Sequence, residues 1–259
     1  FLDCDSDDIP KDTNNVIAIG VSLSTAYNLR GFSGQSYKWL YFDEVIKEPL
    51  EKTRNGEATA FKHFIETCNR NRELNGDESI RCILTGNADS LDSDILFSVG
   101  AIGVIERMKA SKQEVYINTD QGLAVFDLTY SPISVLKKYT SLYKLNKHDR
   151  RFLDVSIKNE FADLAGDETI KPMPINHFKP WCSLNNDIYI YQHKSDGTVY
   201  ITFHKSGTFN KNFDTAIKEQ KQAFKKIYET IWTKLYLTNT VFFETYETKV
   251  AYEIATGHR

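Results

Sequence analysis

Two adjacent carboxylates, Asp43 and Glu44, directly follow the short apolar run Trp39–Phe42. An apolar strand that ends in two acids is the arrangement that P-loop ATPases use, because one acid holds a magnesium ion and the next orients the attacking water. The pattern therefore predicts Mg²⁺ binding by Asp43 and a catalytic base at Glu44. Strands that end in Asp-Glu also occur at solvated turns, so a surface turn is the alternative interpretation.

A second apolar run, Ile80–Leu84, ends at the polar triplet Thr85-Gly86-Asn87. The tip of the strand beside the acidic one is where such ATPases keep a sensor for the γ-phosphate, since ligands gather at the carboxyl ends of parallel strands. Asn87 fits that role. A cap at the strand end is the alternative interpretation for this residue.

Between these runs, the segment Asn69–Glu73 ends a predicted helix and carries Arg70 and Arg72. An arginine at an exposed helix end can neutralise transition-state charge in a neighbouring subunit, because its guanidinium offers a fixed fork of donors to phosphate oxygens. Arginines in the last turn of a helix can instead compensate the helix dipole.

The sequence contains no standard phosphate-binding loop. The stretch Gly31–Ser36 has glycines and serines, but it lacks the lysine and runs into the Trp39 strand instead of opening a helix. We interpret it as an ordinary loop.

Short β-branched runs that alternate with segments of helical period predict an α/β domain with a mainly parallel sheet in the first half of the chain. The predicted elements of the first half are strands at 16–23, 39–42 and 80–84, a helix at 58–72, and a hairpin of 113–118 and 123–128.

The segment from Ser131 to Arg151 is a predicted basic helical linker that offers phosphate contacts. The linker cations are Lys137, Lys138, Lys144, Lys147, Arg150 and Arg151.

The remainder of the chain predicts a second α/β domain. Its Asp196-Gly197 pair is a strong hairpin signal, and Thr245 and Gly257 suit the two ends of a final helix. The domains are placed at 1–130 and 169–259, with the linker at 131–168. The predicted elements of the second domain are strands at 187–192, 198–203 and 235–243 and helices at 212–230 and 245–255.

Composition agrees with a folded protein of two domains. The chain has 259 residues, of which 41% are hydrophobic, and 32 Lys and Arg oppose 35 Asp and Glu, for a net charge of -3. This excludes a disordered tail, a collagen-like repeat and a histone-like polycation. No apolar run approaches the roughly 18 residues of a membrane span, and the four cysteines form no CxxC pair. We expect a soluble intracellular protein with reduced thiols and no membrane partner.

The order of these motifs resembles the DNA encapsidation ATPase of φ29-type short-tailed phages. The resemblance is carried by Leu23-Ser24, Asp43-Glu44, Asn69–Glu73 and Ile80–Ala88, and it returns over Leu237–Ile254. It implies an ASCE-type P-loop ATPase domain followed by a vestigial RNase H-like domain. It also implies a homomeric ring that uses ATP and Mg²⁺ to move double-stranded DNA into a procapsid in the host cytoplasm.

The resemblance further implies roles for single residues. Asp43 and Glu44 become the Walker B pair, Arg70 the trans-acting finger and Asn87 the sensor, while Arg30 falls where the family has a basic residue that reaches a neighbour's nucleotide. In that family the phosphate loop lies upstream of the Leu-Ser strand. The chain is therefore expected to lack its Walker A segment and to be inactive alone. A phage portal or connector and a packaging RNA are the further partners implied.

Two other functions stay open. In the second domain, the predicted first strand, 188–192, has no acid in its interior, which speaks against an RNase H-type nuclease. Lysines of the predicted 212–230 helix, among them Lys221 and Lys225, favour phosphate contact, although a solvated helix face is the alternative. The first alternative to the motor is a non-catalytic nucleic-acid-binding or scaffold protein that has lost its nucleotide site, and the second is a nuclease.

Overall fold

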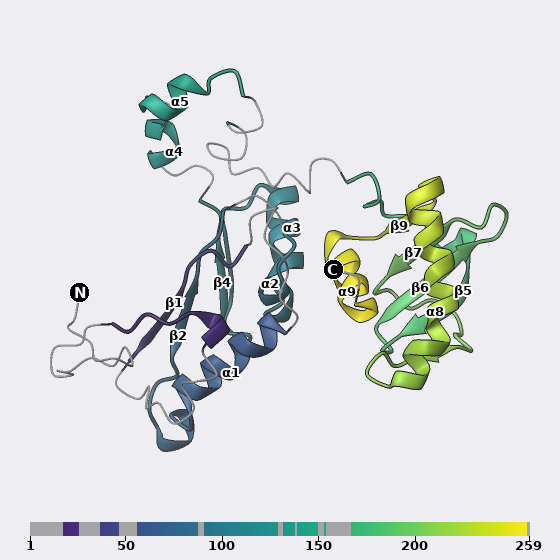
Figure 1. Cartoon of the computed structure of the whole chain (residues 1–259), viewed down its shortest axis with the longest axis horizontal. Coiled ribbons are helices and arrows are strands. Elements are labelled where there is room, and N and C mark those ends of the chain that lie inside the picture. Colours follow the sequence, from purple (N-terminus) through teal and green to yellow (C-terminus); the bar gives the residue numbers. More distant parts are fainter. Residues whose placement is uncertain are drawn as a thin grey trace. The chain divides into compact units, whose positions relative to one another are not determined.

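The computed structural model describes residues 18–25, 37–46, 56–87, 91–128, 132–137, 139–149, 153 and 167–257. Within these ranges the chain is a mixed α/β protein with two sheets of two strands and one of five (Figure 1). It divides into two compact units: Phe1–Tyr41 with Arg54–Ile83, and Phe42–Thr53 with Leu84–Arg259. The division at 130 and 168 stays a prediction. None of the helices in the described ranges has the length and apolar character to cross a bilayer.

Strands β1 (Trp39–Phe42) and β2 (Arg81–Leu84) pair with each other. The amide of Arg81 donates to the carbonyl of Lys38, and the amide of Thr85 donates to that of Phe42. Both bonds advance in the same direction along the two strands, so the strands run parallel. These two predicted strands and their parallel pairing are confirmed, and their carboxyl ends lie at the same edge.

Helix α1 (Glu57–Asn69) connects the two strands and buries Phe61 and Cys68, which lie two turns apart on one face. The Asn69 side chain accepts a hydrogen bond from the Ile80 amide at 2.8 Å and so ties the helix end to the start of β2. The helix was predicted to reach residue 72. It ends at Asn69 because Arg70 has a φ of 36°, and the short turn η2 (Glu73–Asn75) follows.

The strand predicted at 16–23 is wrong over its described residues. Residues 18–22 have no regular structure, and a 3₁₀ turn at 23–25 follows, with the Thr25 amide donating to the Ser22 carbonyl at 3.0 Å. Ile19 and Val21 are exposed, so these two apolar side chains are not buried in a core formed by the described residues.

Two helices and a hairpin follow β2 in the second unit: α2 (Asp94–Ser98), α3 (Ala101–Ser111), β3 (Val115–Asn118) and β4 (Leu123–Phe126). The predicted hairpin is confirmed, because β3 and β4 pair antiparallel. The ion pair of Lys109 with Asp127, at 2.8 Å, joins α3 to it. The basic linker contains the short helices α4 (Pro132–Lys137) and α5 (Ser141–Leu145).

The largest sheet has the strand order β8-β5-β6-β7-β9. Strands β5, β6 and β7 are antiparallel neighbours, whereas β8 runs parallel to β5 and β9 runs parallel to β7. The turn η3 (Ile175–His177) leads into it. The strands are β5 (Phe178–Leu184), β6 (Ile188–His193), β7 (Val199–Thr202), β8 (Asn212–Phe213) and β9 (Val241–Phe243).

The two faces of this sheet differ in side-chain type, because successive residues of a strand point to opposite sides. On one face Ile188, Ile190, Val199 and Ile201 join helices α8 (Lys218–Thr233) and α9 (Tyr246–Thr256) in one core. On the other face aromatic rings gather. They are Phe178, Tyr189, Tyr191, Tyr200 and Phe242, with Met173, Ile175 and Phe209 packed against them.

Several predictions for this domain are corrected. Strand β5 was not predicted, and it, rather than 188–192, is the first strand of the sheet. The helix predicted from 212 begins at Lys218, since 212–213 form β8. The strand predicted at 235–243 is only Val241–Phe243, because the helical run continues as the π-helix η4 (Lys234–Thr238) before Asn239 turns at a φ of 49°.

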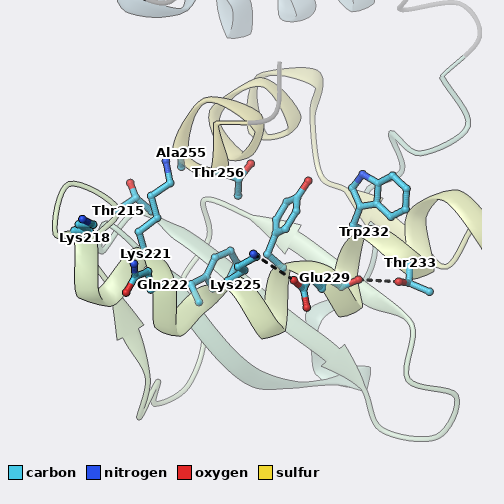
Figure 2. A pocket seen from close by; sticks show the side chains of 12 residues that line it. Thr215, Lys218, Lys221, Gln222, Lys225, Glu229, Trp232, Thr233, Ala255 and Thr256 are labelled. Atoms are coloured by element: carbon cyan, nitrogen blue, oxygen red, sulfur yellow. Dashed lines mark hydrogen bonds and ion pairs between the residues drawn. The ribbon is translucent and has the colours of Figure 1, made fainter.

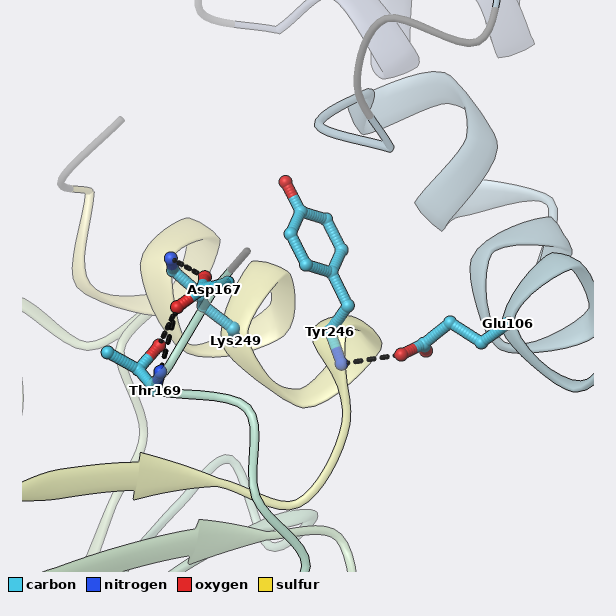
Figure 3. Close-up of polar contacts among 5 residues, drawn as sticks. All are labelled: Glu106, Asp167, Thr169, Tyr246 and Lys249. Carbon is cyan, nitrogen blue, oxygen red and sulfur yellow. Dashed lines mark hydrogen bonds and ion pairs between the residues drawn. The ribbon is translucent and has the colours of Figure 1, made fainter. Parts of the chain in front are cut away.

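Helix α9 is held by carboxylates from outside the sheet (Figure 3). Glu106 of α3 accepts from the amides of Tyr246 and Glu247, at 2.7 and 3.1 Å, at the start of the helix. Burial raises the pKa of Glu106, although the two amides partly offset this. Asp167 binds Lys249 at 2.5 Å. Burial would raise the pKa of Asp167, but its bonds to Lys249 and Thr169 lower it overall. The predicted N-cap Thr245 and the C-cap Gly257 are both confirmed.

Candidate active site

Asp43 and Thr85 meet at the shared carboxyl edge of β1 and β2. The Thr85 hydroxyl donates to Oδ1 of Asp43 at 2.5 Å, and both residues belong to the second unit. Asp43 is exposed and Thr85 is half-buried. The arrangement therefore holds one carboxylate oxygen in a fixed direction and leaves the group open to solvent and ligands.

The segment after Asp43 is fixed by backbone and side-chain bonds. The amide of Val45 donates to the carbonyl of Thr85 at 2.8 Å, and its carbonyl accepts from the buried Ser93 hydroxyl at 2.8 Å. Ser93 also caps the start of α2. Val45 and Ile46 are buried. A β-carbon at position 86 would lie 3.0 Å from Ile46 Cγ1, so Gly86 permits this close packing.

Glu44 has a φ of 57°, in the left-handed region that glutamate seldom adopts. Its amide donates to Oδ1 of Asp43 at 3.1 Å, and its side chain is exposed. Backbone strain of this kind persists where the surroundings enforce it, and it concentrates at functional sites. The two predicted acids thus share one turn, in which Asp43 is oriented and Glu44 projects into solvent.

Asn87 is exposed two residues beyond Thr85, at the end of β2. The parallel pairing places the ends of both strands at one edge, as the sensor hypothesis requires. Arg30 lies outside the described residues.

Arg70 and Arg72 have different environments at the end of α1. Arg72 is 6% exposed, and its guanidinium donates to the Tyr37 carbonyl at 2.6 Å, so it supports the fold. Arg70 is half-buried and terminates the helix. Of the two, Arg70 remains the candidate finger. It lies in the first unit, whereas Asp43 lies in the second.

The donor set at the strand ends fits a hydrated magnesium ion. Mg²⁺ in phosphate-transfer sites takes one or two carboxylates, with water and substrate phosphates completing its shell. Asp43 offers an exposed carboxylate, and the Thr85 hydroxyl bonded to it lies directly after the neighbouring strand, with Asn87 two residues further along the chain. A cage of three or more His, Cys, Asp or Glu side chains does not occur among the described residues.

The predicted phosphate-contacting lysines are only partly described. Lys137 of α4 is half-buried, whereas Lys144, Lys147, Lys221 and Lys225 are exposed. Lys138, Arg150 and Arg151 lie outside the described residues.

The nuclease alternative gains no support from the sheet. Its first strand, β5, contains no acid, and neither do β6, β7 and β9. Glu244 follows β9 and accepts from the Thr202 hydroxyl.

Sequence reasoning did not single out Thr85 or Ser93 as contacts of the acidic turn. For Thr85 the sequence did contain a signal, namely a threonine at the end of the strand beside the acid. For Ser93 the sequence contained no signal, because Ser93 lies 48 residues from its partner Val45.

Comparison with solved structures finds a similar fold in a chain of a viral genome packaging motor assembly. The similar chain belongs to "The bacteriophage Phi-29 viral genome packaging motor assembly". The TM-score is 0.54, the match covers 92% of this chain and 72% of that chain, and the sequence identity is 16%. At this identity the likeness establishes the fold. No family model matches the sequence, and no curated protein does.

Proposed function

We propose that the protein is a subunit of a viral DNA-packaging motor that couples ATP hydrolysis to movement of double-stranded DNA. The observation that carries the proposal is the acidic turn at the shared strand edge, where Thr85 orients Asp43 and Glu44 is held at positive φ. The fold likeness to a chain of a packaging motor supports it.

Each residue of the turn has a distinct part in this proposal. Asp43 would hold the Mg²⁺ of the nucleotide, and Glu44 would accept a proton from the attacking water. Asn87 would contact the terminal phosphate. Bound Mg²⁺ would supply neutralisation of the charge on the phosphate oxygens. Arg70 would donate to phosphate oxygens in a neighbouring subunit, and Arg30 is proposed to reach a neighbour's nucleotide as well.

The partners follow from the same proposal. They are a homomeric ring, double-stranded DNA, a portal or connector and a packaging RNA, at a procapsid in the host cytoplasm. Exposed lysines such as Lys144 and Lys147 are proposed phosphate contacts. The RNase H-like character of the second domain is proposed on the resemblance.

The test is DNA-stimulated ATP turnover by the full-length protein. Glu44→Gln should lower kcat at least a hundredfold, since positioned proton transfer alone contributes about 10²–10⁴. Asp43→Asn should have a similar effect, because it removes the carboxylate proposed to hold Mg²⁺. Asp120→Asn, an exposed acid in the β3–β4 turn, is the matched control and should leave turnover unchanged. Turnover that survives both substitutions would remove these residues from their roles.

A non-catalytic nucleic-acid-binding protein is the second candidate, favoured by the exposed lysines Lys144, Lys147, Lys221 and Lys225. It predicts DNA binding that weakens steeply with salt and does not respond to nucleotide. Binding that changes on addition of Mg-ATP would exclude it.

A further inference from the structure

A groove of about 670 Å³ follows helix α8 and is closed on one side by the last turn of α9 (Figure 2). Its apolar lining includes Phe224, which is 3% exposed, the half-buried Tyr228 and the buried Ala255. The groove therefore combines an apolar floor with an opening along the helix.

Lysines border this floor. Lys218, Lys221 and Lys225 are exposed and lie three and four residues apart, so they share one side of α8. The one acid among the lining residues is Glu229, which pairs with Lys225 at 3.9 Å. Both side chains of this pair are exposed, so the pair contributes little to stability, and Lys225 can bind another anion in place of Glu229. The groove has an excess of positive charge.

Trp232 continues the same side of the helix two turns beyond Lys225 and is 47% exposed. From Lys218 to Trp232 the helix advances about 21 Å at 1.5 Å per residue. A row of cations that ends at an accessible indole suits a ligand that alternates anionic groups with flat aromatic rings. Because every base has a π-face, base stacking on aromatic side chains beside a basic groove is how proteins bind single strands.

We propose that this groove binds unpaired nucleotides, with phosphates on the three lysines and one base stacked on Trp232. A duplex keeps its bases inside the stack, so it would reach the lysines without using Trp232. The inference deepens the nucleic-acid role proposed for Lys221 and Lys225 and rests on it. It adds Lys218, Trp232 and the single-stranded character of the ligand.

The test is equilibrium binding of three fluorescent probes to the chain in the absence of ATP. The probes are dT₁₂, rU₁₂ and a 12-base-pair DNA duplex. Trp232→Ala should weaken single-strand binding about fivefold to a hundredfold and leave duplex binding unchanged. Trp232→Phe keeps a ring and should retain most of the affinity. Comparing dT₁₂ with rU₁₂ tells whether the groove prefers DNA or RNA.

Lysine variants test the phosphate contacts through salt dependence. Lys225→Gln should reduce the slope of log K against log salt by about 0.7, the value for one phosphate of a single strand. Lys226→Gln makes the same charge change at an exposed position on α8 outside the groove, and should leave the slope unchanged.

Three results would overturn the proposal: no binding of either single strand, equal losses for Lys225→Gln and Lys226→Gln, or duplex binding as sensitive to Trp232→Ala as single-strand binding. Displacement of dT₁₂ by a glutamate-rich peptide at equal concentration would assign the groove to acidic protein partners instead. Because the binding assay contains no ATP, a negative result in it does not contradict the proposed ATPase activity. A negative ATPase assay likewise does not contradict binding of single strands in the groove.

Discussion

At the scale of single residues, the hydrogen bond between Thr85 and Asp43 should matter for turnover. Thr85→Val removes the donor while keeping the shape, so it should lower kcat about tenfold, equivalent to about 1.4 kcal/mol. Thr85→Ser should restore most of it. Thr67→Val on α1, which removes a hydroxyl bonded only to its own helix, is the control. A full rate in Thr85→Val would show that Asp43 needs no orientation by its neighbour.

We expect the left-handed backbone of Glu44 to lower the stability of the protein, while its side chain supports turnover. A left-handed backbone costs a residue with a β-carbon roughly 1–2 kcal/mol, whereas glycine adopts it freely. Glu44→Gly should therefore raise the free energy of unfolding by about 1 kcal/mol and abolish turnover. Glu44→Ala should lose turnover without the gain. Urea denaturation of the three proteins measures the difference, and equal stability of the two variants would contradict strain at this position.

Sequence could predict the acidic turn because its residues are neighbours in the chain and end an apolar run. It could also predict that Asn87 lies at the same strand edge, since parallel strands share their carboxyl ends. The bond from Thr85 depends on the register of two strands some forty residues apart. The left-handed backbone at Glu44 had no signal, because glycine usually marks such a position.

At the scale of elements, Ser93 joins the acidic turn to helix α2. Ser93→Ala would remove the cap of α2 and leave the Val45 carbonyl without its side-chain donor, so it should destabilise by about 1–2 kcal/mol. Ser111→Ala, whose hydroxyl bonds the carbonyls of its own helix, should cost less than about 0.5 kcal/mol. Thermal unfolding of both variants gives the comparison, and similar losses would show that the Val45 contact contributes little.

The sequence predicted most elements whose patterns are local. Apolar runs on both sides of the Asp196-Gly197 turn signal located β6 and β7, and helical period with a threonine cap located α9. Strand β5 was missed because Lys179 and Pro180 interrupt its apolar pattern, and the pairing with β6 shifts register between Pro180 and Cys182. The strand predicted at 235–243 was too long because its aliphatic residues also suit the continued helix.

At the scale of the whole molecule, the contact of Glu106 with α9 links the helices after β2 to the five-stranded sheet, all within the second unit. Glu106→Ala would leave two amides of α9 without their acceptor, so hydrogen exchange at Tyr246 and Glu247 should accelerate at least tenfold. Glu114→Ala, an exposed acid before β3, should leave both rates unchanged. Unchanged protection in Glu106→Ala would mean that the sheet domain holds α9 without help from α3.

Stability should depend on pH through Glu253. Burial, together with Asp92 and Asp167, raises its pKa to about 7, although Lys249 opposes the rise. Because the folded state binds this proton more tightly than the unfolded chain, stability should fall as pH increases from about 4.5 to about 7 and then level. The contribution is at most about 3 kcal/mol.

Glu253→Gln removes this ionisation, so the variant should gain more stability at pH 8 than at pH 5 relative to the unaltered protein. Urea unfolding at both pH values measures it. Glu229→Gln on the exposed side of α8 is the matched change and should shift both curves equally. A parallel shift in Glu253→Gln would place the pH dependence elsewhere.

The gathering of aromatic rings on one face of the large sheet has an optical consequence. Tyr191 and Tyr200 are buried on the face away from α8 and α9, where Phe178 makes a tilted ring contact with Tyr200 and Phe209 lies edge-on to Tyr191. They should therefore contribute to the near-ultraviolet circular dichroism of the folded protein, together with Trp181 and Tyr252 on the opposite face. The far-ultraviolet helical signal reports α8 and α9 together with helices outside this layer, such as α1 and α3. Monitored at two wavelengths, one thermal melt therefore compares the loss of packed aromatic rings with the loss of helix.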